Sequence, residues 1–173
     1  MNTNSNYLKS AKSEFLRYKL LGEKAMEQLE PGQLFFSSNE ESNSIAAIVK
    51  HMYGNMLSRW TDFLTSDGEK PWRDRDAEFE ITGYDKEELL RQWEAGWACL
   101  FTATDALKEE QLTEIIYLRQ EAHTVIEAIN RQLTHYVYHV GQIIFVAKQL
   151  KKGPWNSLSI AKGKSKEFNG TKM

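Results

Sequence analysis

Three of the four histidines in this 173-residue chain fall in stretches with helical periodicity. His135 and His139 are four residues apart, so a helix places both imidazoles on one face, one turn apart. Two neutral imidazoles at this spacing can bind one cation, as they do in the His-Glu-x-x-His helix of metalloproteases. A third ligand must come from another segment, and His51 is the natural candidate. The spacing therefore predicts a divalent-metal site formed by His51, His135 and His139.

Three imidazoles suit zinc, nickel, iron or copper, whereas calcium and magnesium prefer oxygen ligands. A zinc ion with three protein ligands keeps a fourth position for water or substrate, which is typical of catalytic sites. A structural zinc site would more often include cysteine, and Cys99 is the only one in the chain. No carboxylate occupies the position that supplies the general base of a metalloprotease, so peptide hydrolysis is not expected.

Small and polar residues accompany the histidines along both stretches. Ser44, Ala47, Gly54 and Ser58 share a lane with His51, and a corresponding polar lane accompanies His135. Both lanes border the apolar stripe of their helix, so packing the two helices together brings the three rings toward one point. Candidates to orient a substrate or a water molecule there are Asn55, Arg59, Tyr138 and Gln142. The alternative is that each histidine is an ordinary hydrogen-bonded residue, as expected for His123.

Four stretches with apolar residues at steps of three and four predict an all-α, four-helix bundle. The first carries a stripe from Leu8 to Leu29 and stops at Pro31-Gly32. The second starts near Ser38, Ser42 or Asn43 as N-cap, carries its stripe to Phe63 and stops at Asp67-Gly68. The third runs from Asp85 to Leu107. The fourth runs from a capping box at Thr124, carries Ile126, Ile129, Leu133, Val137, Val140 and Ile144, and closes at Gly153-Pro154.

The segment 66–84 is polar and far longer than the usual helix–helix turn, which predicts a long crossover between two parallel helices. Arg73 and Arg75 within it either grip an anionic substrate or, as the adjacent acids favour, pair with Asp74, Asp76, Glu78 or Glu80. Residues 112–123 are β-branched and predict an extended turn or small hairpin. We expect one domain over 1–173, with its core at about 6–152 and a tail at 153–173 that lies over the bundle or is partly mobile.

A net charge of −2 and 41% hydrophobic residues are ordinary globular values and give no electrostatic reason to bind nucleic acid or a membrane surface. No apolar run approaches the ~20 residues that span a bilayer, and the N-terminal segment lacks the apolar stretch of a secretory signal. The single cysteine cannot form an internal disulfide. These features favour the cytoplasm. Cys99 itself is either a nucleophile or, as its helical pattern favours, a packing residue.

The chain resembles the DinB/YfiT-like superfamily, and more narrowly its uncharacterised DUF1572 branch, over residues 10–169 or so. The resemblance is carried by His51 and by the segment HYVYHVGQ at 135–142, together with the long segment between the second and third helices. The stretches 51–80, 123–143 and 155–169 are similar to the DUF1572 branch in particular.

This resemblance implies an up-down-down-up bundle that binds one zinc or nickel ion through His51, His135 and His139. Some superfamily members are transferases that use a low-molecular-weight thiol, and one group isomerises maleylpyruvate. For the DUF1572 branch itself the likeness implies no particular activity. The three-histidine site with open coordination positions favours a metal-dependent enzyme acting on a small molecule, such as a transferase with a low-molecular-weight thiol as cosubstrate. The likeness also implies a homodimer. The alternative is a non-catalytic metal- or ligand-binding protein of a stress response.

Overall fold

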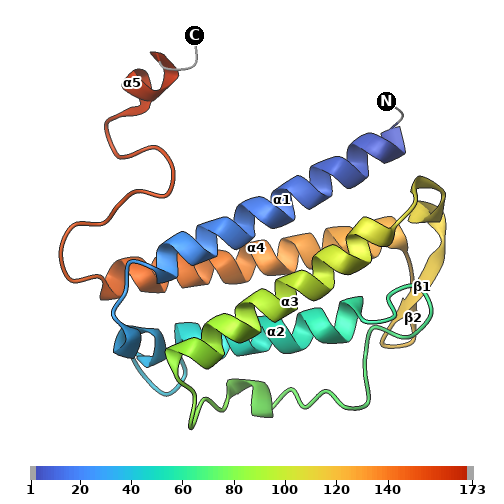
Figure 1. Ribbon diagram of the computed structural model, residues 1–173, viewed down its shortest axis with the longest axis horizontal. Coiled ribbons are helices and arrows are strands. Elements are labelled where there is room, and N and C mark those ends of the chain that lie inside the picture. The colour runs from blue at the N-terminus through green and yellow to red at the C-terminus, as the bar shows by residue number, and fades with distance from the viewer. Residues whose placement is uncertain (1–2, 171–173) are drawn as a thin grey trace.

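The computed structural model describes residues 3–170 and is mostly helical. Four long helices lie side by side (Figure 1): α1 (Thr3–Met26), α2 (Ile45–Trp60), α3 (Lys86–Ala106) and α4 (Val125–Leu150). The shorter elements are three 3-10 helices, a two-stranded sheet and a final helix: η1 (Pro31–Phe35), η2 (Ala77–Phe79), η3 (Glu109–Thr113), β1 (Ile115–Leu118), β2 (Glu121–Thr124) and α5 (Ser165–Gly170). The mostly helical fold expected from the sequence is confirmed.

The starts of α3 and α4 follow the predicted capping residues. The carboxylate of Asp85 accepts a hydrogen bond from the amide of Glu88 at 2.8 Å, and Thr124 and Glu127 form a reciprocal capping box. For α2 the predicted N-caps were wrong, because Ser44 holds that position and accepts from the amide of Ala47 at 3.2 Å. Each cap satisfies an amide that the first helical turn leaves without a partner.

Two helices end earlier than their apolar stripes predicted. The first helix ends at Met26, and the stretch up to Pro31 is a turn. The second ends at Trp60, because Thr61 is extended and Asp62 has a φ of 50°. Phe63, which the sequence placed on the helix, lies in the loop after it, and its side chain is buried in the core. Apolar periodicity thus continued past the helix ends because the adjoining turns also contribute side chains to the core.

The helices enclose one apolar core. Phe15 of α1 lies between Trp60 of α2 and Tyr136 of α4, with ring centroids 6.0 Å apart in both pairs. The inward face of α4 differs from the predicted stripe. Tyr136 and Ile143 are fully buried, while Leu133, Val137 and Ile144 are only half-buried.

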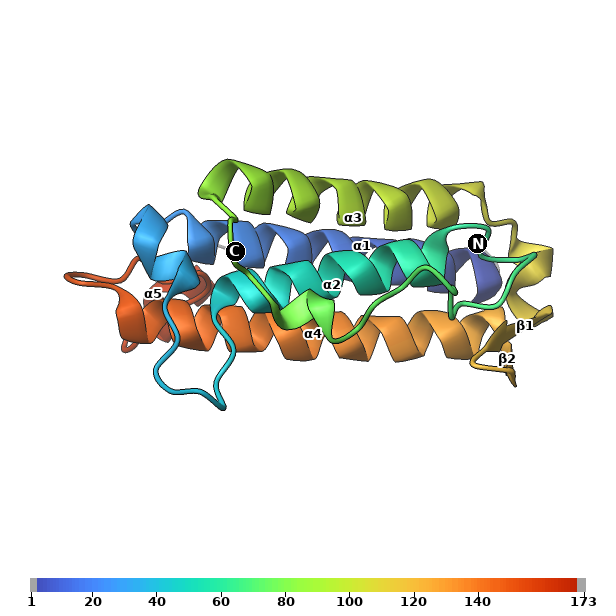
Figure 2. The same ribbon diagram turned by 90° about the horizontal axis from the view of Figure 1, so that it is seen from below.

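Contacts between side chains give the relative directions of neighbouring helices. Tyr53 of α2 lies beside Gly96 of α3, and Thr61, the residue after α2, lies beside Cys99 of α3, so α2 and α3 run the same way. The connecting segment 61–85 therefore returns along the length of the helices, and in Figure 2 it runs alongside α2. The 3-10 helix η2 of this segment is held against α2 by Lys50, which donates hydrogen bonds to the carbonyls of Ala77 (2.6 Å) and Glu80 (2.5 Å).

Residues 112–123 include the predicted hairpin, in which β1 and β2 are antiparallel. Its two-residue turn, Arg119-Gln120, has positive φ at both positions (57° and 64°), as a type I′ turn requires. Asp67 of the crossover accepts hydrogen bonds from both turn amides, at 2.8 and 2.7 Å. The crossover is thereby attached to the hairpin at the end of the bundle.

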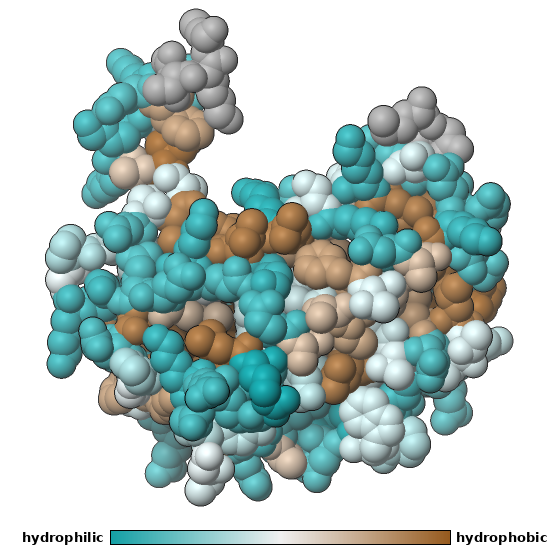
Figure 3. Space-filling view, in the orientation of Figure 1, coloured by the Kyte–Doolittle hydropathy of each residue, from teal (hydrophilic) through white to brown (hydrophobic). Residues whose placement is uncertain are grey.

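Just beyond α4 the chain still contacts the bundle, because Trp155 and Leu158 pack against the core. The amide of Asn156 donates to Oε1 of Gln28, in the turn after α1, at 2.9 Å. The segment that follows projects from the body and ends in α5 (Figures 1 and 3). Within residues 3–170, no helix has both the length and the apolar character needed to cross a membrane.

Candidate metal centre

The three predicted histidines meet in the structure, one from α2 and two from α4. Nε2 of His135 lies 3.4 Å from Nε2 of His51 and 3.1 Å from Nε2 of His139. Each ring offers one nitrogen, and the three nitrogens lie within 4.8 Å of one another. The rings are half-buried at the α2–α4 boundary. The arrangement follows from the i, i+4 spacing on α4 and the antiparallel approach of α2.

These separations suit one transition-metal ion. Metal–nitrogen bonds of 2.0–2.1 Å in tetrahedral geometry place two ligand nitrogens about 3.3 Å apart. The separations of 3.1 and 3.4 Å are close to that value. Two of the three separations therefore match a tetrahedral site, and the third, between His51 and His139, is at most 4.8 Å.

Two of the rings are held by acceptors on their outer nitrogens. Nδ1 of His51 donates to Oε2 of Glu78 at 2.9 Å, and Nδ1 of His139 donates to Oε1 of Gln142 at 2.9 Å. A neutral imidazole protonated at Nδ1 carries its lone pair on Nε2. Glu78 and Gln142 therefore select the tautomer in which His51 and His139 offer Nε2 to a metal, the usual role of residues behind metal ligands.

Glu78 is itself fixed from behind by a buried arginine. Nε and one terminal nitrogen of Arg73 donate to its two carboxylate oxygens at 2.6 and 3.0 Å. Burial alone would raise the pKa of the Glu78 carboxyl, but hydrogen bonds from His51 and Arg73 outweigh it, so the pKa lies below its ordinary value. Glu78 is thus an anion, and it contacts the candidate metal site only through its hydrogen bond with His51.

Gly54, one turn after His51, makes room for this carboxylate. A Cβ at position 54 would lie 2.2 Å from Oε1 of Glu78, well inside contact distance. Only glycine lets the crossover approach α2 this closely. Gly54 therefore leaves the space in which Glu78 can hydrogen-bond to His51.

His135 lies at the centre of the triad. Its Nδ1 is buried and has no hydrogen-bond partner among the described residues. Burial, followed by the neighbouring His139 and His51, lowers the pKa of His135 to about 3. Burial also lowers the pKa of His139, although its bond to Gln142 opposes this. These rings are consequently neutral at pH 7, the form in which imidazole binds a metal.

The four proposed neighbours of the triad fall into two pairs. Gln142 contacts His139 directly, and the exposed ring of Tyr138 lies beside it with centroids 5.1 Å apart. Asn55 and Arg59 are engaged elsewhere. The amide oxygen of Asn55 accepts from the Tyr136 hydroxyl at 3.1 Å, and Arg59 donates to the carbonyl of Gly68 at 2.5 Å.

The part that the crossover contributes to the site was not predicted from the sequence. Glu78 was expected only as an ion-pair partner of the loop arginines, and the Arg73–Glu78 pair is present. The contact of Glu78 with His51 was not foreseen, nor was the stacking of Phe79 on that ring, with centroids 5.3 Å apart. Arg75 pairs with Glu69, outside the expected set. Loop residues have no periodicity that would indicate where their side chains point.

The fold and the triad define a mostly helical protein with a three-histidine cluster that can hold a metal ion. Residues 2–164 match the model of the family described as "Protein of unknown function (DUF1572)", and the chain belongs to that family. No curated protein and no solved structure matches the chain.

Proposed function

We propose that this protein binds one divalent transition metal, zinc or nickel, through Nε2 of His51, His135 and His139. The observation that carries the proposal is the convergence of three Nε2 atoms, two of them on rings whose opposite nitrogens are held by Glu78 and Gln142. Three nitrogen ligands leave coordination positions for an exogenous molecule.

We also propose that the fold is the up-down-down-up bundle of the DinB-like superfamily. The parallel course of α2 and α3 and the long segment between them support this assignment. So does the origin of the triad, with one histidine on α2 and two on α4.

The activity we propose is transfer of a low-molecular-weight thiol to a small electrophile. A bound metal would lower the pKa of the thiol and hold it as the reactive thiolate. The thiol proton would pass to solvent, the sulfur would form a bond to the electrophilic carbon, and the leaving group would depart with its bonding electrons. Phe79 and Tyr138 are exposed aromatic rings that flank His51 and His139, and they would contact the electrophile.

A second candidate is metal or ligand binding without turnover, in a stress response. The engagement of Glu78 favours it over activities that need a general base, because this carboxylate is already bound by Arg73 and His51 and is not free to act as one. Thiol transfer needs no such base once the thiol is ionised, so both candidates remain consistent with the site.

Catalytic turnover distinguishes the thiol transferase from the non-catalytic binding protein. Metal-loaded protein is assayed with bacillithiol, mycothiol and glutathione against a panel of small electrophiles, and thioether formation is followed by mass spectrometry. The transferase proposal expects turnover in the wild type and in His123→Ala, whose histidine lies outside the triad, and loss of turnover in His51→Ala. Metal retention without turnover for any thiol would contradict the transferase and favour the binding protein.

A further inference from the structure

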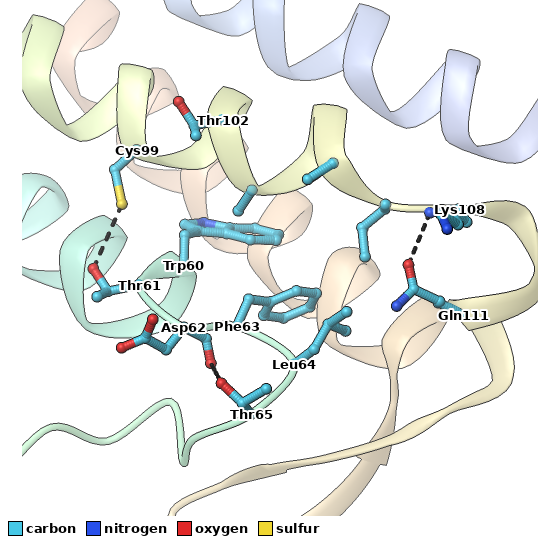
Figure 4. Close-up of a pocket in the computed structure, with 13 residues that line it drawn as sticks. Trp60, Thr61, Asp62, Phe63, Leu64, Thr65, Cys99, Thr102, Lys108 and Gln111 are labelled. Atoms are coloured by element: carbon cyan, nitrogen blue, oxygen red, sulfur yellow. Dashed lines mark hydrogen bonds between the residues drawn. The ribbon is translucent and has the colours of Figure 1, made fainter.

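A second site lies at the end of α2 beyond the triad. Nine residues, or about 13 Å of helix, separate His51 from Trp60. At Trp60 a cavity of about 600 Å³ opens between the segment that leaves α2 and the last turns of α3 (Figure 4). A volume of this size falls within the range of small-molecule sites in proteins. None of the three histidines lines it.

The middle of the cavity is apolar and held in place. Trp60 and Phe63 form one wall, with ring centroids 4.7 Å apart. Trp60 is buried and anchored, because its indole N–H donates to the Tyr136 hydroxyl at 3.0 Å. On α3, Ala103 and Ala106 contribute only methyl groups, which leaves the volume open. This part of the cavity is therefore preformed for an apolar body.

The two ends are polar and differ in charge, because Asp62 lies at one end and Lys108 at the other. Figure 4 shows Thr61 and Cys99 at one end, where Thr61 Oγ1 lies 3.7 Å from the sulfur, and Lys108 and Gln111 at the other. Lys108 is exposed, and its ammonium group has no ion pair or hydrogen bond within residues 3–170. An unpaired ammonium at the end of an apolar cavity complements an anionic head group.

We propose that this cavity binds an elongated organic anion of the medium-chain carboxylate kind. Its chain lies along Trp60, Phe63 and Ala103, and its carboxylate lies at Lys108. The site is independent of the metal centre and does not rest on the function proposed for it.

Cys99 reports occupancy directly, because it lines the cavity and is the only cysteine in the chain. Decanoate, at concentrations below those that form micelles, is the probe. N-ethylmaleimide reacts with the thiolate of Cys99, and burial raises the pKa of this thiol, so the reaction is run at alkaline pH. We expect saturating decanoate to slow the reaction at least tenfold and decanol, which has the same chain without the charge, to protect at least tenfold more weakly.

Two substitutions and one control variant test where the ligand binds. Ala106→Trp fills the cavity from an exposed helix end and should abolish protection, whereas Glu110→Trp adds the same bulk outside it and should not. Lys108→Glu should weaken decanoate binding at least tenfold and leave decanol unchanged.

Three results would overturn the proposal. The first is a Cys99 reaction rate that decanoate does not change. The second is equal protection by decanoate and decanol with no effect of Lys108→Glu. The third is a wild-type dimer in sedimentation that Ala106→Trp dissociates, which would assign the cavity to a second copy of the chain.

Discussion

His51 and His139 each use one ring nitrogen for the protein and leave the other for a ligand. The acceptors differ, because Glu78 carries a charge and Gln142 does not. A carboxylate behind an imidazole raises the basicity of the metal-binding nitrogen. Glu78 is therefore the residue outside the triad that should influence metal affinity most.

Glu78→Gln should weaken zinc binding about 10- to 100-fold, the usual loss when the partner of a metal-bound histidine is changed. The glutamine keeps the shape of the side chain but removes the charge that faces His51 and Arg73. Competition titration against a chromophoric chelator measures the affinity. The matched control is Glu80→Gln, an exposed carboxylate two residues away, which should bind as the wild type does. Equal zinc affinity of the two variants would show that Glu78 does not influence metal binding.

At the scale of elements, the site depends on the crossover as much as on the helices. The segment between α2 and α3 carries Glu78 to His51, and it is fixed at one end by Lys50 and at the other by Asp67. Asp67 accepts hydrogen bonds from the amides of Glu69, Arg119 and Gln120, at 2.7, 2.8 and 2.7 Å. The last two amides belong to the strained hairpin turn.

Asp67→Ala should destabilise the protein at pH 7 by roughly 1–3 kcal/mol, the range for hydrogen bonds to a charged group. Burial opposes ionisation of Asp67, but the three amides prevail and its pKa lies below the ordinary value. The contribution of Asp67 is therefore complete above the unfolded-state pKa of about 3.9 and is lost as the pH falls through the lower folded-state value.

Urea unfolding at a series of pH values measures this effect. The difference between the wild type and Asp67→Ala should shrink below about pH 4. Glu110→Ala, which removes an exposed carboxylate, should unfold as the wild type does at pH 7. A difference that stays constant down to pH 2 would contradict this assignment.

Helical periodicity was sufficient to bring the triad together. The i, i+4 spacing of His135 and His139 and the lane that contains His51 depend only on the geometry of a regular helix. Tyr136 was not part of the apolar stripe predicted for the fourth helix, yet it is fully buried. In the structure its hydroxyl accepts from Trp60 and donates to Asn55. Its partners lie on another helix, so no local pattern could reveal them.

The residues behind the triad could not be predicted for a similar reason. Glu78 reaches His51 because Lys50 anchors the loop backbone and Gly54 leaves space for the side chain. These are contacts between segments more than 20 positions apart. The start of α2 at Ser44 was missed because Ser38, Ser42 and Asn43 are equally suitable N-caps by residue type.

For the whole molecule, a metal at the triad would link α2 to α4 and, through Glu78, to the crossover. The unfolded chain has no preformed site, so binding favours the folded state. Zinc at 100 times its dissociation constant should add about 2.7 kcal/mol to the free energy of unfolding.

Thermal unfolding with zinc and with a chelator measures this stabilisation. The wild type and His123→Ala should unfold at a clearly higher temperature with zinc, whereas His135→Ala should show almost no difference. An equal rise in His135→Ala would mean that the ion binds elsewhere on the chain.

The most direct test is the metal content of protein purified without a His-tag and without added metal, measured by mass spectrometry. The wild type should carry close to one zinc or nickel ion per chain, and His123→Ala should carry the same. The His135→Ala/His139→Ala double variant, verified as folded by circular dichroism, should carry almost none. Equal metal content in the wild type and the folded double variant would contradict the three-histidine centre.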